Sequence, residues 1–150
     1  MAVKPTFLIQ RFERHLWSLG YIPQFSSNAI KGRYGEWMAE KKLIAKNYEF
    51  LTRNWRSKRD RRMEIDLIFK NNGIYVFVEV RTRNVNSLVN GYESFCTQKR
   101  KSVSRSIKLY LAENVTIINH YRLDLIEVDL CNSNKQKPVI FHYENIAISS

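Results

Sequence analysis

Cysteine is scarce in this 150-residue chain, which has only Cys96 and Cys131. Neither lies at metal-site spacing from another ligand, and two cysteines make no disulfide framework. We therefore expect both to be reduced, in a cytoplasmic protein. Long apolar runs are also missing: no stretch approaches the roughly 18 apolar residues of a membrane span, and we expect no signal peptide. These absences argue against a secreted disulfide scaffold and against a membrane partner.

Acidic residues are few beside basic ones. The chain has 14 Asp and Glu against 25 Lys and Arg, which gives a formal net charge of +11. Its 44% hydrophobic and 13% aromatic content is too high for a disordered chain, and its length suits one domain. The positive surplus indicates an anionic partner, for which nucleic acid is the commonest candidate. A basic surface that serves only solubility is the alternative.

Hydrophobic periodicity predicts an alternation of helices and strands. Helices are expected over 7–19, over 33–46 and from Ser94 or Thr97 to 112, and strands over 48–55, 63–70, 74–83, 121–130 and 139–143. The third strand, the last helix and the fourth strand form a crossover unit, so these two strands should run parallel. We predict an α/β fold in which a mixed β-sheet is flanked by helices.

The strongest local signal is an Asn-Gly pair at positions 72 and 73, between two alternating apolar runs. Asn-Gly favours a two-residue hairpin turn, because both central residues of that turn need a positive φ. Such a turn places Asp66 opposite Glu79 and Glu64 opposite Arg81. Facing carboxylates repel each other, and Mg²⁺ or Mn²⁺ would relieve the repulsion. A three-residue loop would instead shift the register by one and separate the carboxylates.

Alternation with a period of two assigns the strand residues to two faces. The first strand would present Met63, Ile65, Leu67 and Phe69 on one face and Glu64, Asp66, Ile68 and Lys70 on the other; the second would separate Ile74, Val76, Val78 and Val80 from Tyr75, Phe77, Glu79 and Arg81. Carboxylates, a divalent cation and a basic surface together suggest phosphodiester cleavage, with Asp66 and Glu79 as metal ligands. A cation one strand step beyond Glu79 would orient the nucleophile or stabilise the transition state.

Basic side chains gather in a loop over 53–62, which has six Lys or Arg against one acid. The predicted nucleic-acid contacts are Arg56, Lys58, Arg59, Arg83 and Arg100. An ordinary solvated loop is the alternative for this segment. Trp55 within it could stack on a base, or it could belong to the core at the end of a strand.

Several short motifs match a known family. They are Gly32-Arg33-x-Gly35-Glu36, Asn54-x-Arg56, Glu64-Ile65-Asp66-Leu67-Ile68, Val76-Phe77-Val78-Glu79-Val80-Arg81-Thr82-Arg83 and Arg122-Leu123-Asp124. Over residues 31–130 the chain resembles the YraN-type family of small bacterial proteins, which is similar to PD-(D/E)XK nucleases and Holliday-junction resolvases. The resemblance implies a three-layer α/β/α, restriction-endonuclease-like core over 31–150, with 1–30 as an N-terminal helical extension. It also implies Mg²⁺ dependence, a DNA substrate and a homodimer.

The resemblance also assigns roles residue by residue. It makes Asp66 the motif aspartate and Glu79 the motif acid, and Glu36 matches the acid that often completes the metal site. Arg81 stands where the motif has lysine. Because arginine stays protonated, it cannot act as a general base, although it could bind the scissile phosphate. Lys99, at the start of the next expected helix, would supply the missing ammonium.

Three functions are open on these observations. The first is a Mg²⁺-dependent endodeoxyribonuclease. The second is a nucleic-acid-binding module that has lost catalysis, which Arg81 at the lysine position suggests. The third is a protein–protein adaptor that docks through the N-terminal extension, whose candidate docking residues are Phe7, Phe12, Leu16 and Trp17. For Arg81 itself, an ion pair with Glu64 is the structural alternative to a catalytic role.

Overall fold

A computed structural model of the chain describes residues 5–21, 23, 26–84, 95, 97–114, 117–131 and 136–148. Its elements are α1 (Pro5–Ser18), α2 (Asn28–Ala45), β1 (Glu49–Arg56), β2 (Glu64–Asn71), β3 (Ile74–Asn84), α4 (Thr97–Glu113), β4 (Tyr121–Leu130) and β5 (Val139–Tyr143). The predicted order is confirmed, and β4 and β5 have the predicted bounds. The largest difference is α2, which begins five residues earlier than the sequence pattern indicated. Ser94 and Cys96 lie outside the described residues.

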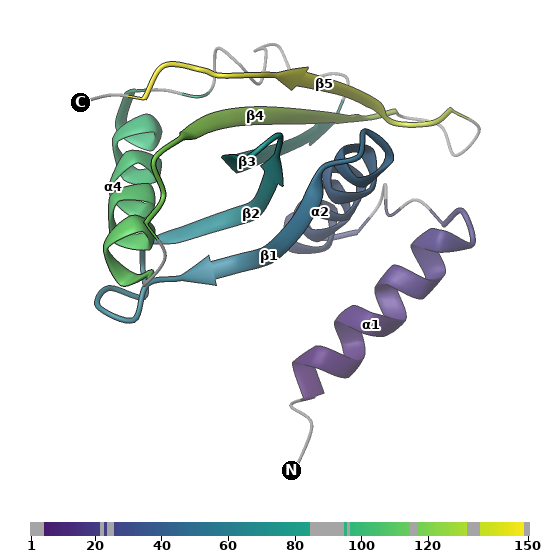
Figure 1. Cartoon of the computed structure of the whole chain (residues 1–150). Helices are drawn as coiled ribbons and strands as arrows, with labels where there is room; N and C mark the ends of the chain where they lie inside the picture. The colour runs from purple at the N-terminus through teal and green to yellow at the C-terminus, as the bar shows by residue number, and fades with distance from the viewer. Residues whose placement is uncertain are drawn as a thin grey trace.

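The five strands form one mixed sheet in the order β1-β2-β3-β4-β5. The pair β3–β4 is parallel and is connected through α4, as predicted, while the other neighbouring pairs are antiparallel. Figure 1 shows α4 on one side of the sheet and α2 on the other. The structure is therefore a three-layer α/β/α arrangement, and the predicted fold class is confirmed. None of the described helices is long and apolar enough to cross a membrane.

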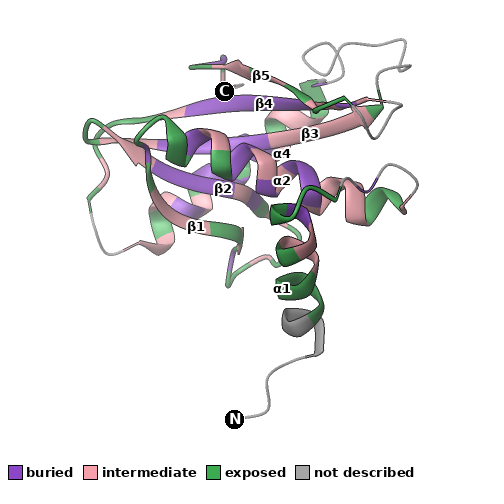
Figure 2. Cartoon of the chain, turned by 90° about the vertical axis from the view of Figure 1, so that its right-hand side faces the viewer, coloured by how far each residue is buried: buried purple, intermediate pink, exposed green. Residues whose placement is uncertain are grey.

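The core consists of two apolar clusters, one on each face of the sheet. On the α2 face, Leu43 packs with valines of β3 and β4. On the α4 face, Ile107 and Tyr110 pack with Phe77 and with leucines of β4. The central strands are buried along most of their length (Figure 2). The sheet therefore has no solvated face at its centre, and the few buried acids of its strands, such as Glu79, need charged or hydrogen-bonding partners.

One prediction about the strand faces is wrong. Ile65 belongs to the cluster under α4, whereas Leu67 belongs to the cluster under α2, so the two do not share a face. The neighbouring strand is distorted at the same level, because Asn54 has a φ of 49° between the residues that pair with Ile65 and Leu67. Asp66 lies at this interruption of the alternation.

Helix α1 packs against α2. The Trp17 ring lies 5.4 Å from that of Tyr34 and 5.8 Å from that of Trp37, measured between ring centroids. Trp17 is only 4% exposed, so the prediction that it docks a partner is wrong: it is a core residue. Phe12 is 62% exposed on the outer side of α1, and Leu16 is half-buried. The side chain of Phe7 lies outside the described part of the chain.

Candidate functional site

The hairpin β2–β3 brings two carboxylates to the end of the sheet where β3 extends past its partner. The predicted two-residue turn and register are confirmed, from the Asn71–Ile74 pair to the Leu67–Val78 pair. Beyond the Leu67–Val78 pair, a side chain takes the place of a backbone partner. Asp66 Oδ2 accepts a hydrogen bond from the Val80 N–H at 2.8 Å. This bond holds the Asp66 carboxylate beside the strand segment that carries Glu79.

Two cations converge on Glu79, which is 4% exposed. Lys99 Nζ, from the first turn of α4, lies 3.0 Å from Glu79 Oε1, and Arg81 Nε lies 3.5 Å from the same oxygen. Both side chains remain about one-third exposed, so a ligand can reach them. The structure thus places an ammonium beside the motif acid although the strand position itself carries arginine.

Glu64, the alternative partner expected for Arg81, forms an ion pair with a different arginine. Glu64 forms its ion pair with Arg56, at the end of β1, while Arg81 pairs with Glu79. Arg81 Nε is buried and makes no hydrogen bond of good geometry. The predicted cross-hairpin pair between Arg81 and Glu64 is therefore wrong, because Arg56 on the neighbouring strand takes Glu64.

A third carboxylate reaches the site from α2. A Cβ added to Gly35 would overlap Thr82 Oγ1 and lie 3.0 Å from Thr82 Cβ, so glycine at this position lets α2 approach β3 closely. The next residue, Glu36, lines the same hollow as Asp66 and Glu79. Close helix–strand packing is thus what delivers Glu36 to the carboxylate pair.

The three carboxylates disturb one another's ionisation. Burial, and then the charge of Asp66, raise the pKa of Glu79 to about 7. The same two causes raise the pKa of Glu36 to about 7, although a hydrogen bond with Asn54 opposes the rise. Burial also raises the pKa of Asp66, against the Val80 N–H bond, which lowers it. Such mutual repulsion between buried acids favours a bound proton or a bound cation.

The hollow at these carboxylates has a volume of about 310 Å³. Its lining residues are Asn28, Lys31, Gly32, Glu36, Asp66, Glu79, Val80, Arg81, Thr82, Arg83, Asn84 and Lys99. Three acids therefore share one open cleft with four basic side chains. Such a cleft has donors for the oxygens of an anionic group and carboxylates for a cation beneath it.

The donor set suits Mg²⁺ or Mn²⁺ with two protein carboxylates. Within the described ranges, no group of three His, Cys, Asp or Glu side chains is arranged to hold a metal ion. Mg²⁺ is commonly bound through one or two carboxylates, with water and substrate phosphate completing its shell. Asp66 and Glu79 fit that pattern. Glu36 stands behind them and is not part of a closed three-ligand cage.

The predicted nucleic-acid contacts differ in their surroundings. Arg83 reaches across to β4, where it binds Asp129 at 2.7 Å and pairs with Glu127. Arg100 donates from Nε to the Phe95 carbonyl at 3.0 Å. Both guanidinium groups are thus held by neighbours that the sequence pattern did not indicate. Their contact with nucleic acid stays a prediction.

The basic loop after β1 is anchored by α4. Glu113 accepts bonds from Ser57 Oγ at 2.5 Å and from the Lys58 N–H at 3.0 Å. The backbone is therefore held, while the Lys58 and Arg59 side chains are exposed. Trp55 packs edge-on against Tyr110, with 5.2 Å between ring centroids, so its role is that of a core residue at a strand end.

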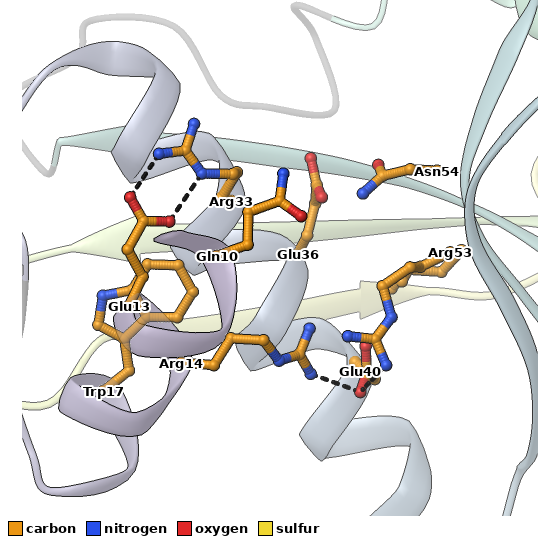
Figure 3. Close-up of a pocket in the computed structure, with 10 residues that line it drawn as sticks. Gln10, Glu13, Arg14, Trp17, Arg33, Glu36, Glu40, Arg53 and Asn54 are labelled. Atoms are coloured by element: carbon orange, nitrogen blue, oxygen red, sulfur yellow. Dashed lines mark hydrogen bonds and ion pairs between the residues drawn. The ribbon is translucent and has the colours of Figure 1, made fainter. Parts of the chain in front are cut away.

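Sequence reasoning missed a second group of polar residues behind the carboxylates. Arg14 Nη2 and Arg53 Nη2 lie 2.7 Å and 3.3 Å from the same oxygen of buried Glu40. Beside them, Glu13 holds Arg33 through both of its carboxylate oxygens (Figure 3). No sequence spacing links α1 with β1, so only the tertiary structure brings these residues together.

Comparison with known sequences identifies relatives over the part of the chain that carries the site. Residues 35–128 match the profile of the uncharacterised protein family UPF0102. A UPF0102 protein of Clostridium novyi is 33% identical over 106 residues, which cover 71% of this chain and 86% of the relative. A UPF0102 protein of Carboxydothermus hydrogenoformans is 31% identical over 115 residues, or 77% and 92% of the two chains. The matched region contains all three carboxylates and Lys99, while α1 lies before the profile match.

Proposed function

The chain belongs to the uncharacterised protein family UPF0102, and from the geometry of its site we propose that it binds nucleic acid and cleaves phosphodiester bonds in DNA with a divalent cation. The observation that carries this proposal is the triad of Asp66, Glu79 and Lys99. Glu79 faces a like charge on one side and the Lys99 ammonium 3.0 Å away on the other. Two acids and a lysine in one cleft are the groups that metal-assisted phosphoryl transfer needs.

Each side chain has a definite task in this proposal. Asp66 and Glu79 would hold Mg²⁺ or Mn²⁺, which polarises a phosphoryl oxygen and lowers the pKa of a bound water. Lys99 would bind the phosphate and offset the charge that develops in the transition state. The guanidinium group of Arg81 has N–H groups that do not face Glu79, and these would donate to a second phosphate oxygen. Because Glu79 and Glu36 bind protons near neutral pH, the cation would bind more tightly as the pH rises through 7.

Two further observations support the proposal. The chain carries a formal net charge of +11, which favours a polyanionic substrate. Its motifs resemble those of PD-(D/E)XK nucleases, with a lysine that comes from α4 instead of the strand. Fold resemblance alone is a weak argument for a reaction, so the argument rests on the site.

The test is cleavage of labelled single-stranded, duplex and four-way-junction DNA in Mg²⁺ and in Mn²⁺. The wild-type protein should cut at least one of these substrates, and Asp66→Asn and Glu79→Gln should each remove the cutting. Glu49→Gln, a carboxylate change at an exposed position of β1, is the matched control and should cut as the wild type does. Cutting that survives in the Asp66 and Glu79 variants would contradict the assignment of the site.

A catalytically silent nucleic-acid-binding protein is the second candidate. Arg81 favours it, because arginine occupies the strand position that carries lysine in the nucleases that the chain resembles. This candidate predicts DNA binding that weakens steeply with salt, through counterion release, without cuts in any metal. Arg81→Lys separates the two: new cutting in that variant alone would indicate a decayed nuclease. If the protein neither binds nor cleaves DNA, a protein–protein adaptor is the remaining candidate.

A further inference from the structure

A second hollow lies outside the carboxylate site, between α1 and β1. Its volume is about 610 Å³, and it is lined by Gln10, Arg11, Arg14, Arg53 and Asn54. None of these five residues is acidic. Figure 3 shows Gln10 and Arg14 of α1 facing Arg53 and Asn54 of β1. We call this hollow the arginine groove.

The arginine groove has more positive than negative charges, and a single acid, Glu40, binds two of its arginines. Glu40 is 5% exposed, and one of its oxygens binds both Arg14 and Arg53. Arg11 is exposed and forms no ion pair within the described ranges. Three guanidinium groups against one carboxylate leave about two positive charges at the groove. Burial lowers the pKa of Arg53; the charge of Glu40 opposes this change, and the charge of Arg14 adds to it.

The arginine groove lies near the carboxylate site. A small hollow shares Gln10, Arg14, Arg53 and Asn54 with the groove, and Glu36 lines that hollow as well. Glu36 also lines the cleft that holds Asp66, Glu79 and Lys99. Glu36 therefore borders both the carboxylate cleft and the small hollow beside the arginines, and its hydrogen-bond partner Asn54 lines the arginine groove.

We propose that the arginine groove binds the phosphodiester backbone of a nucleic acid, beside the phosphate that the carboxylate site would engage. Guanidinium groups bind phosphate through two parallel N–H bonds, and Glu40 keeps two of them oriented before the ligand arrives. The idea rests on the proposed function for the identity of the ligand. Because α1 lies outside the family match over 35–128, three of the five groove residues come from a part of the chain that the profile does not cover.

The test compares two double variants that each remove two positive charges. Arg11→Gln/Arg53→Gln changes the groove, and Lys46→Gln/Lys137→Gln is the control, since Lys46 lies beside His142 of β5, at the sheet edge opposite β1. The readout is the affinity for fluorescein-labelled duplex and single-stranded DNA, measured by anisotropy in EDTA at several salt concentrations. The groove variant should bind about tenfold more weakly at low salt. Its slope of log K against log salt should be smaller by about 1.8 for duplex DNA and by about 1.4 for single-stranded DNA, as expected for two lost phosphate contacts.

The outcomes separate this proposal from the proposed function. A groove variant whose slope equals that of the control overturns the groove, even if the wild type cuts DNA. Groove-dependent binding without any cutting supports the groove and overturns the nuclease. Loss of binding to poly-glutamate with unchanged DNA binding would make the groove a site for acidic peptides and overturn the proposal. If the double variant melts at a lower temperature than the wild type, the single variant Arg11→Gln decides, because Arg11 forms no ion pair with the residues that the structure describes. This variant should show about half of the slope change.

Discussion

At the residue scale, Glu79 is the group on which the electrostatics of the site converge. Its carboxylate is buried, repelled by Asp66 and attracted by Lys99 and Arg81. The resulting pKa of about 7 lies close to physiological pH. A small change in the surrounding charge therefore alters how much of Glu79 is ionised, and only the ionised form can hold a cation.

Removing the Lys99 ammonium should favour the protonated form of Glu79 over the ionised form. Lys99→Met takes away the cation 3.0 Å from Glu79 Oε1, so the pKa of Glu79 should rise further. We expect Mg²⁺-dependent cleavage to fall about 100-fold or more, the usual loss when one charge-stabilising donor is removed. NMR titration of labelled glutamate carboxylates measures the pKa shift independently of activity. Lys101→Met, an exposed change in the same helix, should leave both readouts unchanged.

The raised pKa of Glu79 also predicts how stability depends on pH. Between pH 4.5 and about 7 the folded protein keeps a proton that the unfolded chain has released. Stability from this group is therefore complete below pH 4.5 and is lost as the pH rises through 7, by up to about 3 kcal/mol. Glu79→Gln keeps the shape of the side chain and removes the titration. In EDTA, urea midpoints should fall less between pH 5 and pH 8 for Glu79→Gln than for the wild type.

Glu36 provides an internal check on that experiment, since its own raised pKa leaves part of the pH dependence in the Glu79→Gln protein. Glu49→Gln, at an exposed position, should retain the full wild-type dependence. Identical pH dependence in the wild type and in Glu79→Gln would show that Glu79 is ionised normally, and the electrostatic account of the site would be wrong.

At the scale of elements, the contact between α2 and β3 sets the geometry of the site. Gly35→Ala should destabilise the protein by about 1–3 kcal/mol, because the new methyl group overlaps Thr82 and the helix must move outward. Gly32→Ala is the matched control: nothing lies within 4 Å of its added Cβ, and alanine favours a helix by roughly 0.5–1 kcal/mol. Thermal melting should therefore move in opposite directions for the two variants. Equal shifts would mean that α2 does not press on β3.

The strands and their pairing could be predicted from the sequence, because alternating apolar residues and the Asn-Gly turn are local patterns. The Asn-Gly turn determines the register of β2 and β3, and both of its residues have the positive φ that the turn requires. The break in the alternation of strand faces at Asp66 could not be predicted from the sequence. The alternation is interrupted where a side chain takes the place of a backbone partner, and the distortion on β1 lies at a residue distant in sequence, Asn54.

The candidate site was partly predictable for the same reason. Asp66 and Glu79 are brought together by one hairpin, which local rules describe. The contact of Lys99 with Glu79 needs the crossover helix to be placed, and only the family resemblance pointed to that lysine. Arg14 and Glu40 were missed because their contact depends on how α1 docks, which no local pattern encodes.

At the scale of the whole molecule, α1 is joined to the rest of the fold by buried aromatic rings and by ion pairs. Trp17→Ala should cost about 3–5 kcal/mol, the usual loss for truncating a buried aromatic residue. Phe12→Ala, at a 62% exposed position of the same helix, should change stability by less than about 0.5 kcal/mol. Urea unfolding followed by circular dichroism would measure both. A wild-type transition with two steps, one of them insensitive to Trp17→Ala, would show that α1 folds apart from the sheet.

The central claim is that Asp66 and Glu79 form a divalent-cation site, and Mn²⁺ binding tests it most directly. Electron paramagnetic resonance of free Mn²⁺, titrated with protein at pH 8 and at pH 5.5, counts bound ions without requiring any catalysis. We predict one site at pH 8 that weakens at pH 5.5, below the raised pKa of about 7 of Glu79, and that is lost in both Asp66→Asn and Glu79→Gln. Equal Mn²⁺ binding by the wild type and both variants, or no change with pH, would contradict the account.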